Sequence, residues 1–209
     1  MLSYDDVTGK PAIPVSNLDY GLAAAHLLDL SYQGKLAVDH GRLAVLDHTD
    51  DDPVLAKIWA QRPHSTDWWV YHLADPKRRE DILDRLVGAG LLERREHRIL
   101  GVFPVRAYPE VDPAKERALV DHLRDVVAGG AEPDERSVAL LALAHGCLLD
   151  RHLLPAMNSA AVRQRLNELT QGEWCTAAVR KVVTAMNVAV LAAVSGGIVA
   201  STSGAVTGT

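Results

Sequence analysis

Apolar positions recur at steps of three and four through most of this chain, which is the period of a helix with one buried face. A run of this kind lies near the C-terminus and predicts a core helix. A second segment, residues 135–155, is nearly all apolar and predicts one helix at the centre of the fold. The residues of the C-terminal run are Val179, Val182, Val183, Met186, Val190 and Val194.

Capping and turn residues divide the rest of the pattern into further helices. An Asp directly before a Pro favours a helix start, because the carboxylate caps free backbone N–H groups and Pro fits the first turn. Asp75–Pro76 therefore separates two helices within residues 65–92, and Asp112–Pro113 begins another. The remaining predicted helices cover residues 16–34, 49–61 and 159–194, the last of these being divided at Gly172.

Three short segments alternate between strand-like and turn-like residues and predict β-hairpins. They are residues 2–15, 35–48 and 85–104, and the third is interpreted as a helix end, a strand, a charged turn and a second strand. The predicted fold class is mainly α, a single globular helical domain with several short β-hairpins. That domain spans residues 1–194, and residues 195–209 are predicted to be a disordered tail of small residues.

Composition narrows the classes of function. The net charge of −5 argues against general nucleic-acid binding, since phosphate neutralisation needs a surplus of Lys and Arg. Cys147 and Cys175 both lie in apolar helical patterns and are interpreted as buried free thiols. The N-terminus lacks the basic and apolar runs of a secretory signal. These features together predict a cytoplasmic protein, with the inner face of the membrane as a possible location.

The uncharged C-terminal segment, residues 182–209, leaves two interpretations open. A membrane span needs about 20 strongly apolar residues. Here Asn187, the pair Gly196–Gly197 and several Ser and Thr interrupt the segment. The core helix is therefore the preferred interpretation, and the membrane span is the alternative.

A search for reactive groups yields few candidates. The motifs of nucleotide-binding loops, serine hydrolases and zinc proteases do not occur in the sequence. His145, Cys147, Asp150 and His152 form the nearest metal-like pattern, interpreted as a core His145 and a surface His152. Trp68 and Trp69 cannot both face one core, so one is expected at a surface or groove. No catalytic residue, metal or cofactor is predicted, and the chain is expected not to be an enzyme.

Basic residues are concentrated between Pro76 and Arg106. Lys77, Arg78 and Arg79 fall at a predicted helix N-terminus, where backbone N–H groups favour anions and basic side chains oppose the helix dipole. A bound phosphate would relieve that opposition, and a solvated charged face is the alternative. A possible basic membrane patch follows, made of Arg94, Arg95, Arg98 and Arg106.

Four segments in register carry a family resemblance: residues 18–36, 78–92, 99–113 and 136–150. In this order they resemble the Golgi phosphoprotein 3 family, from Leu2 to about Val194. Arg outnumbers Lys and Ala is abundant, which is typical of a GC-rich genome and of a bacterial branch of the family.

The resemblance implies a mostly helical, non-enzymatic fold. Eukaryotic members bind phosphatidylinositol 4-phosphate on Golgi membranes, form oligomers through a hairpin and hold glycosyltransferase tails. Their headgroup pocket uses a Trp, an Arg of the first helix and a further pair of Arg. In this chain those positions are Pro14, Ala23, Pro76 and Arg79, so only Arg79 keeps the family residue. Lys77 and Arg78 are neighbours that can substitute.

The leading hypothesis is a peripheral membrane protein that binds an anionic, phosphoinositide-like lipid headgroup through Arg79, Lys77 and Arg78. Its expected partners are the membrane surface and further copies of the chain, joined through a hairpin. The first alternative is an oligomeric scaffold or adaptor without a ligand. The second is a winged-helix DNA binder built on residues 77–89 and the hairpin, where acidic residues would repel phosphate.

Overall fold

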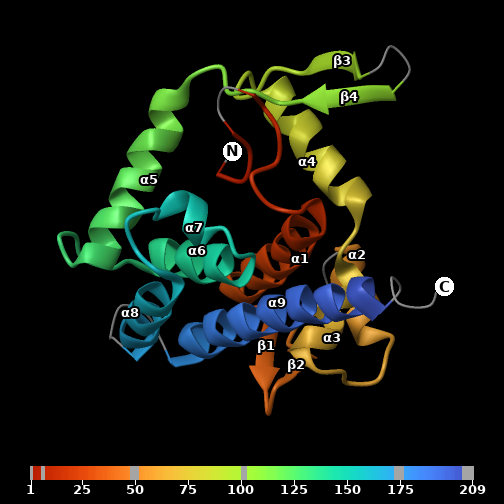
Figure 1. Ribbon diagram of the computed structural model, residues 1–209. Helices are drawn as coiled ribbons and strands as arrows, with labels where there is room; N and C mark the ends of the chain where they lie inside the picture. Colours follow the sequence, from red (N-terminus) through yellow and green to blue (C-terminus); the bar gives the residue numbers. More distant parts are fainter. Residues whose placement is uncertain (1, 6–7, 48–51, 100–102, 172–176, 204–209) are drawn as a thin grey trace.

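The computed structural model describes residues 2–5, 8–47, 52–99, 103–171 and 177–203 (Figure 1). In this part of the chain the protein has nine helices and two small antiparallel hairpins, and 62% of it is helical. The predicted fold class is therefore confirmed. The helices are α1 (Val15–Tyr32), α2 (Pro53–Trp59), α3 (Thr66–Leu73), α4 (Pro76–Gly88), α5 (Pro113–Ala128), α6 (Glu135–Gly146), α7 (Asp150–Leu153), α8 (Ser159–Gln171) and α9 (Ala177–Ser203).

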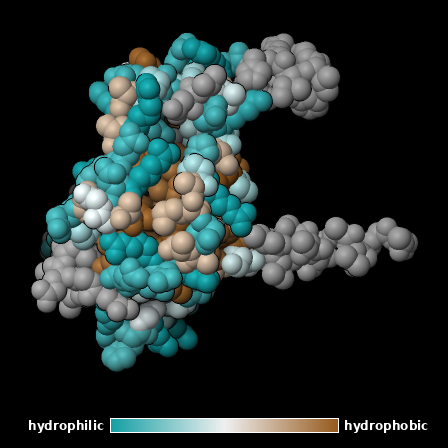
Figure 2. Space-filling model, turned by 60° about the vertical axis from the view of Figure 1, so that its left-hand side comes forward, coloured by the Kyte–Doolittle hydropathy of each residue, from teal (hydrophilic) through white to brown (hydrophobic). Residues whose placement is uncertain are grey.

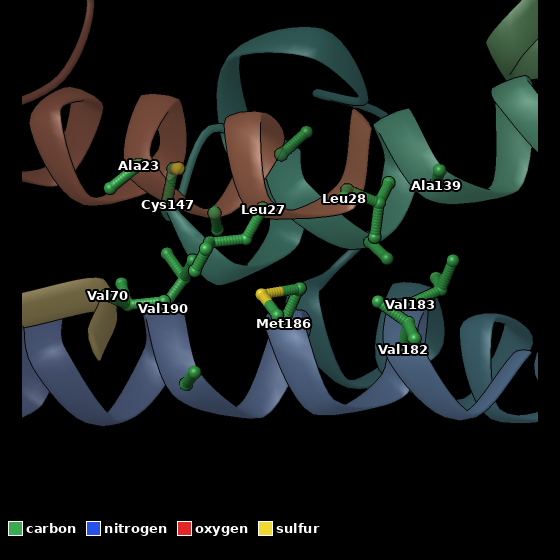
Figure 3. Close-up of a cluster of buried hydrophobic side chains, with 14 of the residues drawn as sticks. Ala23, Leu27, Leu28, Val70, Ala139, Cys147, Val182, Val183, Met186 and Val190 are labelled. Atoms are coloured by element: carbon green, nitrogen blue, oxygen red, sulfur yellow. The ribbon is translucent and has the colours of Figure 1, made fainter. Parts of the chain in front are cut away.

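The core lies between α9 and the three helices that pack on it, α1, α3 and α6. Leu27 of α1, Val70 of α3, and Met186 and Val190 of α9 are fully buried there, and their side chains point toward one another (Figure 3). The predicted C-terminal core helix is thus confirmed for positions 182 to 194, while the side chain of Val179 lies outside the described residues. In Figure 2, hydrophilic residues cover most of one face and hydrophobic ones gather mainly in its middle.

Aspartate caps begin four of the helices, and two of these starts, Asp75–Pro76 and Asp112–Pro113, were predicted from the sequence. The side chains of Asp52, Asp75, Asp112 and Asp134 each accept a backbone N–H of the following turn. The first three of these precede a Pro at the first helical position. The predicted break between α3 and α4 at Asp75–Pro76 is therefore confirmed, and the capping hydrogen bonds are its physical cause.

The described part of the chain contains two antiparallel hairpins. Strands β1 (Leu36–Asp39) and β2 (Arg42–Val45) meet at His40–Gly41, which both have positive φ as a two-residue hairpin turn requires. Strands β3 (Arg95–Ile99) and β4 (Phe103–Ala107) form the second hairpin. The interpretation of its charged segment, residues 93–98, as a turn was wrong, because Arg95 to Arg98 lie in β3. Glu96 there lies opposite Arg106 and pairs with it, which stabilises a charged strand.

The segment predicted as one central helix is broken into α6 and α7. Leu148 has a φ of 62° and ends α6, with Leu149 N–H donating to Ala144 O and Leu148 N–H donating to His145 O. This is the usual hydrogen-bond pattern of a left-handed helix end, although that position is more often Gly. The apolar sequence gave no sign of the break, because Cys147 and Leu149 on either side of Leu148 are both buried.

The predictions for the two ends of the chain, an N-terminal hairpin and a C-terminal tail, agree with the structure only in part. The N-terminal hairpin expected over residues 2–15 is represented by a single bridge between Tyr4 and Pro11. At the other end α9 continues to Ser203, so the expected tail boundary at Ser195 falls inside this helix, and residues 204–209 lie outside the described part. Within the described residues, no helix is long and apolar enough to cross a membrane.

Candidate functional site

The three basic residues at the N-terminus of α4 extend in two different directions. Asp75 caps this helix by accepting the Lys77 N–H at 2.9 Å. Lys77 and Arg78 line a groove between α4 and the middle of α1, whereas Arg79 reaches the start of α1. The three predicted headgroup residues therefore do not form one cluster.

The groove between α1 and α4, called the α1–α4 groove below, has a volume of about 930 Å³. Its lining combines apolar side chains with charges of both signs. The Nε atom of Arg78 is buried, and no hydrogen bond to it is found within the described part of the chain. Its lining residues are Leu22, Ala25, His26 and Asp29 from α1, and Asp75, Lys77, Arg78, Asp81, Ile82, Arg85, Leu86 and Ala89 from α4 and its flanks.

Arg79 forms an internal ion pair instead of facing this groove. Its Nη1 lies 2.5 Å from Asp19 Oδ1 and also donates to Val15 O at 3.3 Å. The two side chains are only 14% and 9% exposed. Burial raises the pKa of the Asp19 carboxyl, and the neighbouring Arg79 charge opposes that rise. Arg79 is therefore already neutralised, and the pair joins the first turn of α4 to α1.

The positions that match the family's headgroup pocket do not line the groove. Pro14 and Pro76 are exposed, and Arg79 pairs with Asp19 as described above. Ala23 is 1% exposed and lies in the core near Cys147 and Val190 (Figure 3). An Arg at position 23 would have to enter this core, so the chain cannot assemble a headgroup pocket there without repacking α1 against its neighbours.

The arginines of the proposed membrane patch are paired with neighbouring acids. Arg94 pairs with Asp84, Arg95 Nη2 lies 2.7 Å from Glu93 Oε2, and Arg106 Nε lies 3.2 Å from Glu96 Oε1. The side chain of Arg98 lies outside the described residues. These pairs are solvent-exposed, and exposed pairs contribute only about 0–1 kcal/mol, so a surface ligand can replace them.

The metal-like pattern around His145 has a structural role. His145 Nδ1 lies 3.2 Å from Asp150 Oδ2 in a buried pair, while His152 is exposed. Cys147 is buried, as predicted, and burial raises the pKa of its thiol to about 12. Among the described residues there is no group of three or more His, Cys, Asp and Glu that could hold a metal ion. Cys175 lies outside the described part.

The tryptophan prediction is confirmed. Trp69 is fully buried, while Trp68 is only partly buried and its ring stacks between His64 and His72, with centroid distances of 3.8 and 3.6 Å. This stack lies on α3 and its N-terminal flank, and none of its rings lines the α1–α4 groove.

Sequence reasoning missed most of the groove. Asp81 and Arg85 follow Lys77 at steps of four, a spacing that places all three on one face of α4. Leu22, Ala25, His26 and Asp29 recur at steps of three and four, which places them on one face of α1. The signal was present in each helix separately, but nothing in the sequence indicated that the two faces lie opposite each other.

The fold and this groove define a mainly helical protein with a charged groove beside one helix N-terminus. The chain belongs to the Golgi phosphoprotein 3 (GPP34) family, whose model matches residues 1–186. This match confirms the family resemblance found in the sequence. A search of curated proteins gave no match.

Proposed function

We propose that this chain is a cytoplasmic, peripheral membrane protein that binds the phosphate of an anionic lipid headgroup at the N-terminus of α4. The observation that carries the proposal is the position of Lys77 and Arg78 on the α1–α4 groove. Family membership supports the same conclusion. The proposal assigns no catalytic step, metal or cofactor.

Lys77 and Arg78 provide two neighbouring positive charges for a phosphate, although the net charge of the chain is −5. The Asp75 cap already accepts the Lys77 N–H, so the attraction comes from the basic side chains. Each basic side chain near an anionic surface adds about 1 kcal/mol of attraction. In this proposal Lys77 and Arg78 contact the phosphate, and Arg79 holds α4 in place through Asp19. Arg94, Arg95, Arg98 and Arg106 supply a second, weaker contact with the membrane.

Vesicle flotation tests the proposal. The probe is phosphatidylcholine vesicles with and without an anionic phospholipid, and the variant is Lys77→Ala/Arg78→Ala. Loss of two basic side chains should cost about 2 kcal/mol, which is roughly a 30-fold weaker partition onto anionic vesicles. Arg79 is kept, because removing it would leave Asp19 buried without its partner.

A matched control is Lys115→Ala/Arg117→Ala, which removes two exposed basic side chains from α5. It should float like the unmodified protein. Equal flotation of the Lys77→Ala/Arg78→Ala variant and the unmodified protein on anionic vesicles would rule out this site.

A scaffold without a ligand is the second candidate. It is favoured by the β3–β4 hairpin, which lies at the edge of the molecule, away from the helical core (Figure 1). Sedimentation velocity tests this candidate, since a scaffold that assembles through the hairpin should form oligomers without any lipid. A monomer at all concentrations, together with lipid-dependent flotation, would reject it.

A further inference from the structure

We infer that the α1–α4 groove binds a headgroup that carries a primary ammonium beside its phosphate, which is the chemistry of an aminophospholipid. The inference rests on the proposed function, because it takes the phosphate at Lys77 and Arg78 as given. It adds the class of headgroup, and different residues of the groove carry it.

The groove carries equal numbers of positive and negative charges. Lys77, Arg78 and Arg85 contribute three positive charges, and the carboxylates of Asp29, Asp75 and Asp81 contribute three negative ones. Carboxylates disfavour a ligand that is only negative, and most of all a headgroup with several phosphates. A ligand with both signs matches this lining better than a purely anionic one.

These charges also remain apart from one another. Within the described part of the chain, Asp29, Asp81, Lys77, Arg78 and Arg85 form no ion pair, unlike the described arginines of the β3–β4 hairpin. Lys77, Asp81 and Arg85 follow at steps of four, which commonly allows pairing along a helix. Their charged groups therefore keep their hydrogen-bonding capacity for a ligand.

The arrangement has the dimensions of a small headgroup. Lys77 and Asp81 are one turn apart, a rise of about 6 Å along α4. In an ethanolamine-type headgroup two carbons separate the phosphate ester oxygen from the nitrogen, so the phosphate can lie at Lys77 and the ammonium at Asp81. A primary ammonium donates up to three hydrogen bonds to carboxylates, which a quaternary ammonium cannot do.

Vesicles of equal charge separate this inference from plain attraction to anions. Phosphatidylserine and phosphatidylglycerol each carry one net negative charge, but only phosphatidylserine has an ammonium. At the same mole fraction in phosphatidylcholine, the unmodified protein should bind phosphatidylserine vesicles about threefold more tightly, as expected for one added exposed ion pair. Asp81→Asn and Asp29→Asn should each reduce this preference without weakening binding to phosphatidylglycerol.

Glu80→Gln is the matched control, since Glu80 is an exposed acid on the same helix and does not line the groove. It removes the same charge and should keep the preference for phosphatidylserine. If the unmodified protein binds both vesicle types equally and Asp81→Asn changes nothing, the inference is wrong while the proposed lipid binding stands.

A second experiment, with soluble compounds in place of vesicles, tests whether the ligand of the groove is a lipid or a free metabolite of the same chemistry. Isothermal titration calorimetry with O-phosphoethanolamine and with inorganic phosphate should show tighter binding of the amine-bearing compound, and Asp81→Asn should abolish the difference. Such binding without flotation on any vesicle would support the groove chemistry and reject the lipid. Absence of binding in both formats would overturn both proposals.

Discussion

Arg79 is the residue for which the structure differs most from the role that the sequence suggested. It is the single basic residue retained from the family pocket, yet its guanidinium pairs with Asp19. Both side chains are largely buried, so each depends on the other for charge compensation. The residue that looked most like a ligand contact thus connects two helices.

Replacing Arg79 with Ala should lower the free energy of unfolding by about 3 kcal/mol, because the Asp19 carboxylate would be left buried without its partner. Asp19→Asn in the same chain should restore much of that loss. Urea denaturation measures both effects. A loss below about 0.5 kcal/mol for Arg79→Ala would mean that the pair contributes little.

Gly21 is a second residue whose identity is determined by tertiary packing. A Cβ at this position would lie far inside contact distance of the Cys147 Sγ, although Gly21 occupies a helix where Ala is intrinsically better. Gly21→Ala should therefore destabilise the protein by about 1–3 kcal/mol. Cys147→Ala should reduce this cost, since it removes the clashing atom. A double-mutant cycle by urea denaturation tests the coupling, and additive effects would contradict it.

At the scale of elements, aspartate caps define where helices begin. Asp134 accepts the Arg136 and Ser137 N–H groups at 3.0 and 3.1 Å, and the Ser137 hydroxyl donates to its other oxygen at 2.5 Å. The hydrogen bond from the Ser137 side chain is the main cause that lowers the pKa of this carboxyl. The α6 N-terminus therefore depends on an ionised Asp134.

This cap predicts a pH-dependent contribution to stability. A carboxyl whose pKa is lower in the folded state stabilises the protein above the unfolded value, about pH 4, and loses that contribution as the pH falls. Asp134→Ala should cost about 1 kcal/mol near neutral pH and progressively less as the pH falls below about 4. Denaturation at several pH values measures this, with Asp134→Asn as a control that keeps a cap but not the titration. A cost independent of pH would contradict the prediction.

At the scale of the whole molecule, α9 organises the core by contacting α1, α3 and α6. Met186 and Val190 are fully buried among these helices, while Val188 on the same helix is 60% exposed. The fold therefore depends on one face of α9, and this face is the apolar run seen in the sequence.

Met186→Ala should lower the free energy of unfolding by about 2–5 kcal/mol through the cavity it leaves. Val188→Ala, the control on the exposed face, should change it by less than about 0.5 kcal/mol. Equal effects of the two variants in thermal or urea unfolding would show that α9 does not pack as described.

Much of the fold could be predicted because its signals are local. Helical periodicity, the Asp–Pro starts of α2, α4 and α5, and the His40–Gly41 turn all depend on residues within one or two turns of each other. The break at Leu148 could not be predicted in this way, because a Leu in the left-handed region has no local signature. The pairing that places charged residues within β3 likewise depends on a partner strand.

By itself the sequence determined a mainly helical domain, a core helix near the C-terminus, the family, and a basic helix start at residues 77–79. Tertiary structure alone decided that Lys77 and Arg78 face a groove with Asp29 and Asp81, and that Arg79 turns away to Asp19. The physical reason is distance along the chain. Asp19 and Arg79 are 60 residues apart, so no local preference couples them, and only the packing of α1 against α4 brings their charges together.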